Sequence, residues 1–308
     1  METNSTVKII NKKTDKVQSL FIFSMLVVPI AAFLFFYVYI NINSFLMAFQ
    51  RPIYGGSGGV KWGFDNFTMF FSSLSGVNSD ILLALRNTLI FFCTNIFIKL
   101  PLSLIICYFI YKKLLFGKAF RAIIYLPNII TGTIFATLYK YIVGSGGPLF
   151  AIWESMGVDP IYLFANSDYA MGGMLIFVIY TGLGGNFVLL SGAMNAIDNS
   201  VIDAGKIDGA GPFRELVSII MPCIWPTLGT MILLASIGVF TADGPLLLFT
   251  QGQYKTMTLN FWIFGMTTGI GSTTDYEYAS AVGLIFTLLG LPIVYIVTRI
   301  TQVIKDSD

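Results

Sequence analysis

Polar side chains recur at regular spacing inside one of the longest apolar stretches of the chain. Asn95, Lys99 and Ser103 are four residues apart, so on a helix they share one face. Pro101 lacks a backbone donor and frees the carbonyl of Phe97 beside them. An ionisable group at mid-bilayer costs at least about 2.5–3.5 kcal/mol, so it normally faces the protein interior or a wet cavity. Two interpretations follow: Lys99 lines a solute path and attracts an anionic group, or it pairs with a carboxylate or carbonyl of a neighbouring chain.

A second set of candidates lies near the ends of two other apolar runs. Asp243 is followed by Gly244-Pro245, a pair that should break or kink a helix there. Lys140 lies at a similar depth in the membrane. Three roles therefore remain for these two residues: an ion pair with each other, part of a gate, or a contact with the solute. The glycines at 182, 184 and 185 favour close helix packing over binding.

Much chemistry is excluded by what the sequence lacks. The chain has no histidine, which excludes Ser–His–Asp and Cys–His catalysis, histidine-ligated metals and histidine proton relays. Cys93, Cys107 and Cys223 form no CxxC pair, so we expect neither a disulfide framework nor a zinc site. No G-x-x-x-x-G-K-[ST] segment is present to bind ATP. We predict no catalytic residue, no metal site and no cofactor in this chain.

The elements that position these residues must be membrane helices. Hydrophobic residues make up 56% of the 308 residues and charged ones 11%, with a mean hydropathy of +0.78. A bilayer core about 30 Å thick needs roughly 20 apolar residues per helix. We therefore predict an all-α membrane protein with one transmembrane domain, 20–308, after a tail at 1–19. Its six transmembrane helices are expected at about 20–40, 88–111, 123–143, 171–194, 223–243 and 279–303.

Basic residues orient the predicted helices. Most of the 18 Lys and Arg lie in the N-terminal tail, between spans 2 and 3, between spans 4 and 5, and after span 6. The positive-inside rule assigns these segments, and hence both termini, to the cytoplasm. The net charge of only +2 gives no basic surface for nucleic acid, so the lipid bilayer is the expected environment.

The cytoplasmic loop between spans 4 and 5 is predicted to form two short helices. Asn199-Ser200 can cap a helix over 201–207, and Asp203 near its start suits the helix dipole. Gly209 can take the positive φ that ends such a helix, and Pro212 fits the first turn of the next one. A plain connector is the alternative interpretation.

The same loop resembles the EAA motif of ABC-importer permeases, E-A-A-x-x-x-G-x(9)-I-x-L-P, at every spacing. The residues on the motif positions are, in order, Asp203, Ala204, Gly205, Gly209, Ile219, Met221 and Pro222. The run Asp208-Gly209-Ala210 matches the D-G-A form typical of the carbohydrate-uptake branch, which is similar to maltose-type permeases. Two residues depart from the motif: aspartate replaces the glutamate, and Gly205 replaces an alanine, which loosens a helix by up to about 1 kcal/mol.

Other stretches carry the resemblance as well, among them Phe120-Arg121-Ala122 with Leu126-Pro127 in span 3. Arg86-Asn87-Thr88-Leu89 opens span 2, and Phe64-Asp65-Asn66-Phe67 in the first outer loop is similar to an L-D-N-Y/F element.

The resemblance implies a role and partners. The motif would form a coupling helix seated in a cytoplasmic ATPase subunit. The chain would be one permease of a bacterial importer in the cytoplasmic membrane, not itself an enzyme. Its partners would be a second permease, expected to be a related chain in a heterodimer, two ATPase subunits that bind ATP and Mg, an extracytoplasmic solute-binding protein and a saccharide. In such permeases the middle of span 4 and the end of span 5 contribute to the substrate path, which implies roles for Tyr180, Asn186, Thr241 and Asp243 beside Asn95 and Lys99.

Other functions remain open at this point. The coupling motif is shared by ABC permeases for solutes other than sugars. An ATP-independent secondary transporter or channel would use an ion gradient and leave the loop without a function. An acidic saccharide as substrate is an extension that rests on Lys99 alone.

Overall fold

The computed structural model describes residues 3–53, 59–74, 80–113, 116–270 and 274–306. Residues 1 and 2 of the predicted tail lie outside this range. The chain divides into two compact units, one of residues 1–69 with 275–284 and one of residues 70–274 with 285–308.

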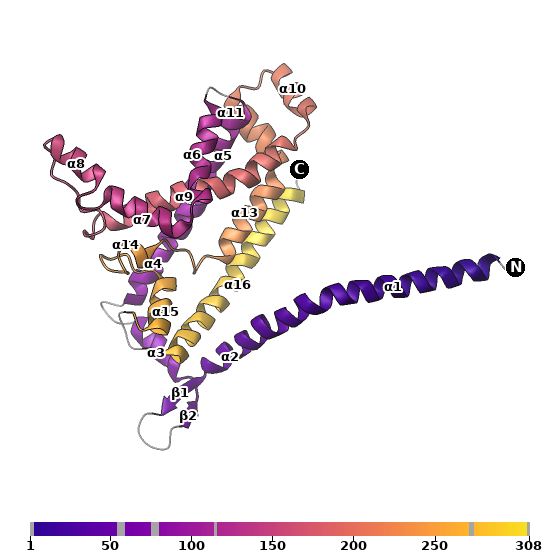
Figure 1. Ribbon diagram of the computed structural model, residues 1–308, viewed down its shortest axis with the longest axis horizontal. Helices are drawn as coiled ribbons and strands as arrows, with labels where there is room; N and C mark the ends of the chain where they lie inside the picture. The colour runs from indigo at the N-terminus through magenta and orange to yellow at the C-terminus, as the bar shows by residue number, and fades with distance from the viewer. Residues whose placement is uncertain (1–2, 54–58, 75–79, 114–115, 271–273, 307–308) are drawn as a thin grey trace. The chain divides into compact units, whose positions relative to one another are not determined.

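The first unit begins with a long helix. α1 (Thr3–Ala32), the π-helical segment η1 (Phe33–Tyr39) and α2 (Ile40–Met47) follow one another without a break (Figure 1). Its apolar stretch, Gln18–Met47, has no buried residue, as expected of a helix that faces lipid or another chain. An antiparallel pair of strands follows, β1 (Gln50–Ile53) and β2 (Gly59–Trp62), in which Arg51 is opposite Lys61.

The second unit holds most of the remaining helices. Their bounds are α4 (Asp80–Cys93), η2 (Thr94–Lys99), α5 (Leu100–Tyr111), α6 (Gly117–Ile129), α7 (Gly132–Val143), α8 (Pro148–Ser155), α9 (Ala170–Asn195), α10 (Asn199–Ile207), α11 (Pro212–Glu215), η3 (Leu216–Ile220), α12 (Met221–Cys223), α13 (Trp225–Ile237), α14 (Leu246–Phe249) and α15 (Leu259–Thr268). Two helices, α3 (Asp65–Leu74) and α16 (Tyr276–Asp306), contribute residues to both units.

Helices long and apolar enough to cross a membrane are found at four places within the described residues. They are Gln18–Met47, Asp80–Tyr111, Ala170–Asn195 and Tyr276–Gln302. Two bent pairs also qualify, Gly117–Ile129 with Gly132–Ser155 and Pro212–Cys223 with Trp225–Ile237, bent by 109° and 76°. The number of spans is therefore four, or up to six if each bent pair counts as one, and the six predicted spans match the upper number.

The predicted span at 123–143 is not one straight helix. α6 ends at Ile129, Ile130 takes an extended conformation (ψ 141°), and Thr131 has ψ 131° before α7 begins at Gly132. Pro127 lies in the last turn of α6, where its missing N–H and its ring weaken the helix. The chain consequently turns by 109° at this point.

The predicted span at 223–243 also differs from the structure. Its helix bends at Ile224 (ψ 6°) between two segments that each carry a proline near the start, and α13 ends at Ile237. Asp243 therefore lies beyond the helix, in the irregular segment before α14. The break predicted at Gly244-Pro245 is part of this segment.

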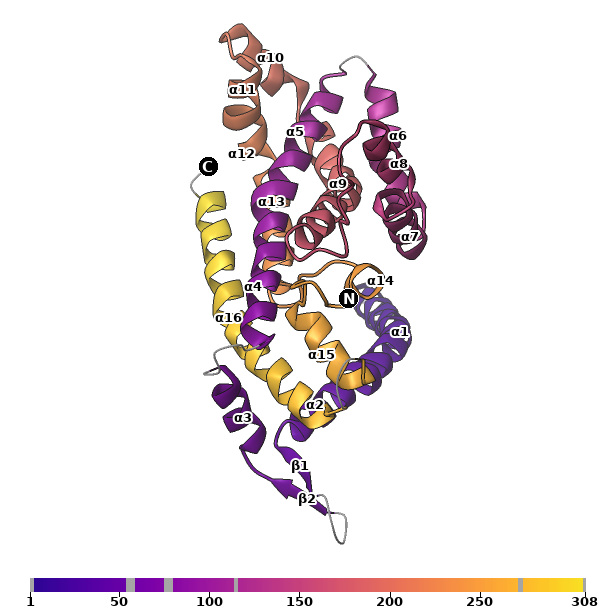
Figure 2. The same cartoon turned by 90° about the vertical axis from the view of Figure 1, so that its left-hand side faces the viewer.

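Two cores organise the second unit. The first joins α5, α6, α9, α10, η3 and α13 through buried aliphatic residues such as Leu190, Ile202 and Ile220. The second is aromatic and includes Phe91, Phe177 and Phe249. The long helix α9 packs between α5 and α6, as Figure 2 shows.

Candidate functional site

The loop between α9 and α13 folds as two helices joined by a tight turn. Asp198 caps α10, because its Oδ1 accepts a hydrogen bond of 2.9 Å from the Ser200 amide. This bond from the Ser200 amide, with a further one from its hydroxyl, holds the pKa of the Asp198 carboxyl below its usual value. The cap is thus one residue earlier than the predicted Asn199-Ser200, and α10 begins at Asn199.

The turn after α10 confirms the predicted roles of its glycine and proline. Gly209 has φ 75°, and its amide bonds to the carbonyl of Lys206 at 3.0 Å. The next amide, that of Ala210, bonds to the carbonyl of Gly205 at 2.9 Å, which completes a Schellman motif. Pro212 then opens α11.

Gly205 and Ile219 bring the two halves of the EAA-like sequence together. A Cβ on Gly205 would overlap Cδ1 of the Ile219 side chain. Gly205 is buried, as are Ile202 and Ile220 around it. The departure from alanine at position 205 thus lets the isoleucine of the motif pack directly on α10.

The other residues predicted for coupling lie mostly on the outside of this segment. Asp203 pairs with Lys206 at 2.7 Å on the exposed face of α10. Ile207 and Phe213, which the motif comparison did not single out, are 86% and 79% exposed. Ile207 is the last residue of α10 and Phe213 lies in the first turn of α11, so both lie beside the Schellman turn. Exposed with them are Ala204, Asp208, Gly209 and Pro222, while Ala210 is partly buried.

Lys99 lies where η2 meets α9. A Cβ on Gly182 would be 2.5 Å from Cδ of Lys99 and 3.0 Å from its Nζ, so the lysine packs flat on the glycine. Gly184 likewise lets α6 approach α9 closely, since a Cβ on Gly184 would lie 2.7 Å from the Ile124 carbonyl oxygen. The expected packing role of these two glycines is confirmed. For the Lys99 amine no hydrogen bond or ion pair is found in the described part of the chain.

Asn95 and Asn186 join Lys99 in a polar strip. The Asn186 amide donates to the Ser103 hydroxyl at 3.2 Å, and that hydroxyl donates to the Lys99 carbonyl at 2.7 Å. Asn95 Oδ1 is buried and has no partner among the described residues. The Leu100 amide reaches back five residues to the Asn95 carbonyl, the π-helical bond that often marks functional sites.

The remaining predicted path residues have other partners. The Tyr180 hydroxyl donates to the Ile123 carbonyl of α6 at 3.0 Å. Thr241 donates to the Gly238 carbonyl at 3.3 Å, and Asp243 accepts a bond of 2.7 Å from Asn260. Lys140 donates to the Leu248 carbonyl. Lys140 and Asp243 thus bond to other residues, and the ion pair between them, one of the alternatives above, is not found among the described residues.

The residues that open the predicted span 2 fix the loop between α14 and α15. Asn87 donates to the carbonyls of Lys255 and Met257 at 2.8 and 2.7 Å. Thr88 accepts a bond of 2.9 Å from the Leu259 amide. Both side chains are buried, so this stretch positions backbone.

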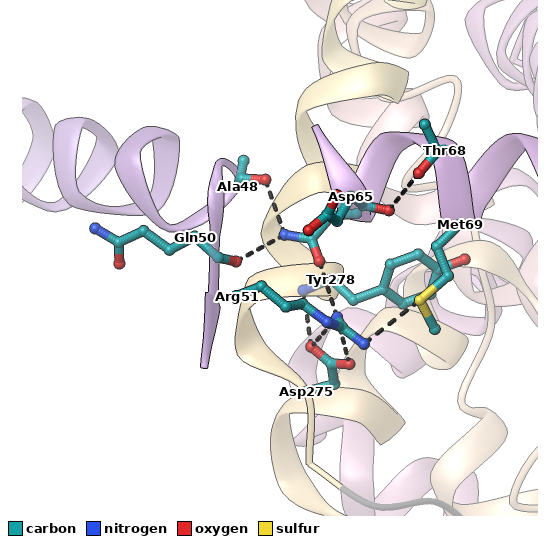
Figure 3. Close-up of polar contacts among 9 residues, drawn as sticks. Ala48, Gln50, Arg51, Asp65, Thr68, Met69, Asp275 and Tyr278 are labelled. Carbon is teal, nitrogen blue, oxygen red and sulfur yellow. Dashed lines mark hydrogen bonds and ion pairs between the residues drawn. The ribbon is translucent and has the colours of Figure 1, made fainter. Parts of the chain in front are cut away.

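Asn66 plays a similar part in the first unit. Its amide donates to the carbonyls of Ala48 and Gln50 at 2.9 Å each, and its oxygen accepts from Arg51 at 2.8 Å (Figure 3). Arg51 also pairs with Asp275 at 3.0 Å. This network ties the start of β1 to the residue before α16.

Comparisons with known proteins agree on one type of protein, although no family model matches the chain. The chain is 25% identical over 286 residues to protein LplB of Bacillus subtilis strain 168, covering 88% of this chain and 85% of that protein. It is 23% identical over 285 residues to the polygalacturonan/rhamnogalacturonan transport system permease protein YteP of the same strain, covering 90% and 87%.

A solved structure shares the fold. A chain of a bacterial ABC transporter involved in the import of the acidic polysaccharide alginate superposes with a TM-score of 0.79 at 21% identity, covering 95% of this chain and 98% of that chain. The alginate transporter in complex with an alginate pentasaccharide-bound periplasmic protein gives the same TM-score, with 95% and 97% covered. The chain is therefore a multi-pass membrane protein with the ABC permease fold, and its homologues are carbohydrate ABC transporter permeases.

Proposed function

We propose that this chain is a transmembrane permease subunit of a bacterial binding-protein-dependent ABC importer for an oligosaccharide. The observation that carries the proposal is the segment 198–224, in which the EAA-like residues form a capped helix, a Schellman turn and a second helix packed on the first through Gly205 and Ile219. Such a segment has a function only if another protein moves it.

That other protein is a cytoplasmic ATPase. Two ATPase subunits bind ATP and Mg, and one of them receives the exposed face of α10 with Ile207 and Phe213. The segment and both chain termini lie in the cytoplasm, with residues 1–19 as a tail and 20–308 as the permease domain of a protein in the bacterial cytoplasmic membrane. A second, related permease completes the pathway, and a solute-binding protein delivers the saccharide from outside.

The solute path follows the strip of Asn95, Lys99 and Asn186, with Thr241 and Asp243 as contacts nearer the outer side. A lysine amine that has no partner among the described residues and lies inside a membrane helix is expected to meet an anionic group or water. The substrate we propose is therefore an acidic oligosaccharide. The names of YteP and of the alginate transporter support this assignment.

Purification of the tagged chain from its native membrane in mild detergent tests the proposal. We expect an ATPase subunit and a second permease to co-purify, and we expect the ATPase to be lost when Asp203 and Gly209 are substituted. A variant at the exposed, unrelated position Lys118 is the matched control. Recovery of the chain without an ATPase in several detergents would favour an ATP-independent transporter.

A further inference from the structure

One ion pair between a half-buried lysine and a buried glutamate joins α5 to the segment between α9 and α13. Lys112 follows the last residue of α5, and its Nζ lies 2.8 Å from both carboxylate oxygens of Glu215 at the end of α11. Glu215 is only 3% exposed and is the one charged residue that is buried within the described part of the chain.

Among the described residues, Lys112 is the side chain that bonds to the Glu215 carboxylate. Its neighbour Leu216 belongs to the same core as Leu104 and Tyr108 of α5. The Lys112 ammonium also lies 5.9 Å from the centre of the Tyr108 ring, in cation–π range. A buried carboxylate that loses its counter-ion is strongly destabilised, so Glu215 and Lys112 must move together or the core must open.

The pair differs in kind from the apolar contacts around it. Apolar packing is non-directional, so two helices can slide while they keep much of their buried area. A charge pair with two hydrogen bonds and a buried carboxylate is directional and costly to break. Lys112 also directly follows the helical stretch Asp80–Tyr111, which carries Asn95 and Lys99, at the end that the proposed topology assigns to the cytoplasm.

We propose that the Lys112–Glu215 ion pair is the positioning contact through which movement of the segment 198–224 reaches the helix that carries the solute path. This inference rests on the proposed function. When the ATPase displaces α10 and α11, Glu215 moves with them, and Lys112 transmits the displacement to α5. Both residues act through Lys99 and its neighbours and touch neither ATP nor solute.

The test uses the complete transporter in proteoliposomes and measures saccharide imported per ATP hydrolysed, normalised to assembled complex. Lys112→Met and Glu215→Gln are each expected to lower this ratio by at least about fivefold, the lower end of typical coupling between sites. The ATPase itself should continue to turn over. The charge-reversed pair, Lys112→Glu with Glu215→Lys, should recover a substantial part of the ratio. Lys113→Met, the adjacent exposed lysine, is the matched control and should leave it unchanged.

Three results would overturn the inference. In the first, the single variants keep the wild-type ratio. In the second, the charge-reversed pair has a ratio no higher than that of either single variant. In the third, all these variants, the reversed pair included, lose only assembled complex while the ratio of saccharide imported to ATP hydrolysed stays constant. That last result would mean that the pair serves stability alone. Failure of the proposed function looks different, because the wild-type complex itself would then show no ATP-dependent uptake.

Discussion

The hydroxyl of Tyr180 donates a hydrogen bond to the carbonyl of Ile123, which lies four residues before Pro127. Proline has no N–H to fill that position, so the helix would otherwise leave the Ile123 carbonyl unpaired. Tyr180 on α9 therefore supports α6 where α6 is weakest, just before the bend of 109°. This contact gives Tyr180 a structural role that its proposed place in the substrate path does not require.

Tyr180→Phe is consequently expected to lower the stability of the chain by about 1 kcal/mol, the usual loss for one hydrogen bond. Thermal unfolding in detergent measures this, with Tyr141→Phe, an exposed tyrosine, as the control. The KM for saccharide should not change. A raised KM with unaltered unfolding would instead assign Tyr180 to the substrate.

Gly205→Ala should weaken the segment despite the better helix propensity of alanine. The gain is at most about 1 kcal/mol, whereas the new methyl group would overlap Cδ1 of Ile219. Ile219→Val removes that atom, so the double variant should recover the ATPase that the single variant releases during purification. Equal ATPase retention in all three proteins would show that the side chain of Ile219 simply moves aside.

Lys99→Met should reduce uptake of an acidic oligosaccharide by about tenfold or more in kcat/KM, in keeping with about 1.4 kcal/mol or more for one charge contact. Uptake of a neutral oligosaccharide, where the complex accepts one, should change little. Lys99→Arg keeps the charge and should retain most of the activity. An equal loss for acidic and neutral substrates would contradict an acidic preference.

Asn87→Ala removes two hydrogen bonds to the backbone carbonyls of Lys255 and Met257. We expect a loss of about 2–3 kcal/mol and faster proteolysis within residues 250–258. Asn195→Ala, which removes one exposed bond within α9, is the control and should change neither. Resistance to protease equal to that of the wild type would mean that other contacts hold this loop.

The sequence predicted best those features that depend on local chemistry. Gly209 and Pro212 lie where a turn and a helix start require them, because positive φ and a missing N–H act on the backbone alone. Pro101 and Pro127 both lie within apolar runs, and local chemistry alone does not predict their different effects on the helix. Pro101 lies at the start of α5 in a continuous span, whereas Pro127 comes shortly before Ile130, whose extended backbone begins a sharp bend.

The candidate sites were harder to predict where a side chain pairs with a distant one. In the sequence, Lys112 was recognised only as one of the charges that orient the helices. Nothing in the sequence near Lys112 indicates that it pairs with Glu215, which lies 103 residues away. Asn66 and Asn87 were recognised by resemblance, but their bonds to backbone carbonyls depend on the fold. Of the predicted path residues, the strip of Asn95 and Lys99 followed from helical spacing, while the partners of Tyr180 and Asp243 did not.

The most direct test of the account is saccharide uptake into proteoliposomes that contain this chain with its co-purified partners, in the absence of any ion gradient. The account predicts uptake that requires ATP and Mg on the cytoplasmic side and the solute-binding protein on the other. It also predicts that uptake stops when Asp203 and Gly209 are substituted together. Uptake that proceeds without ATP and follows an imposed ion gradient would contradict the account.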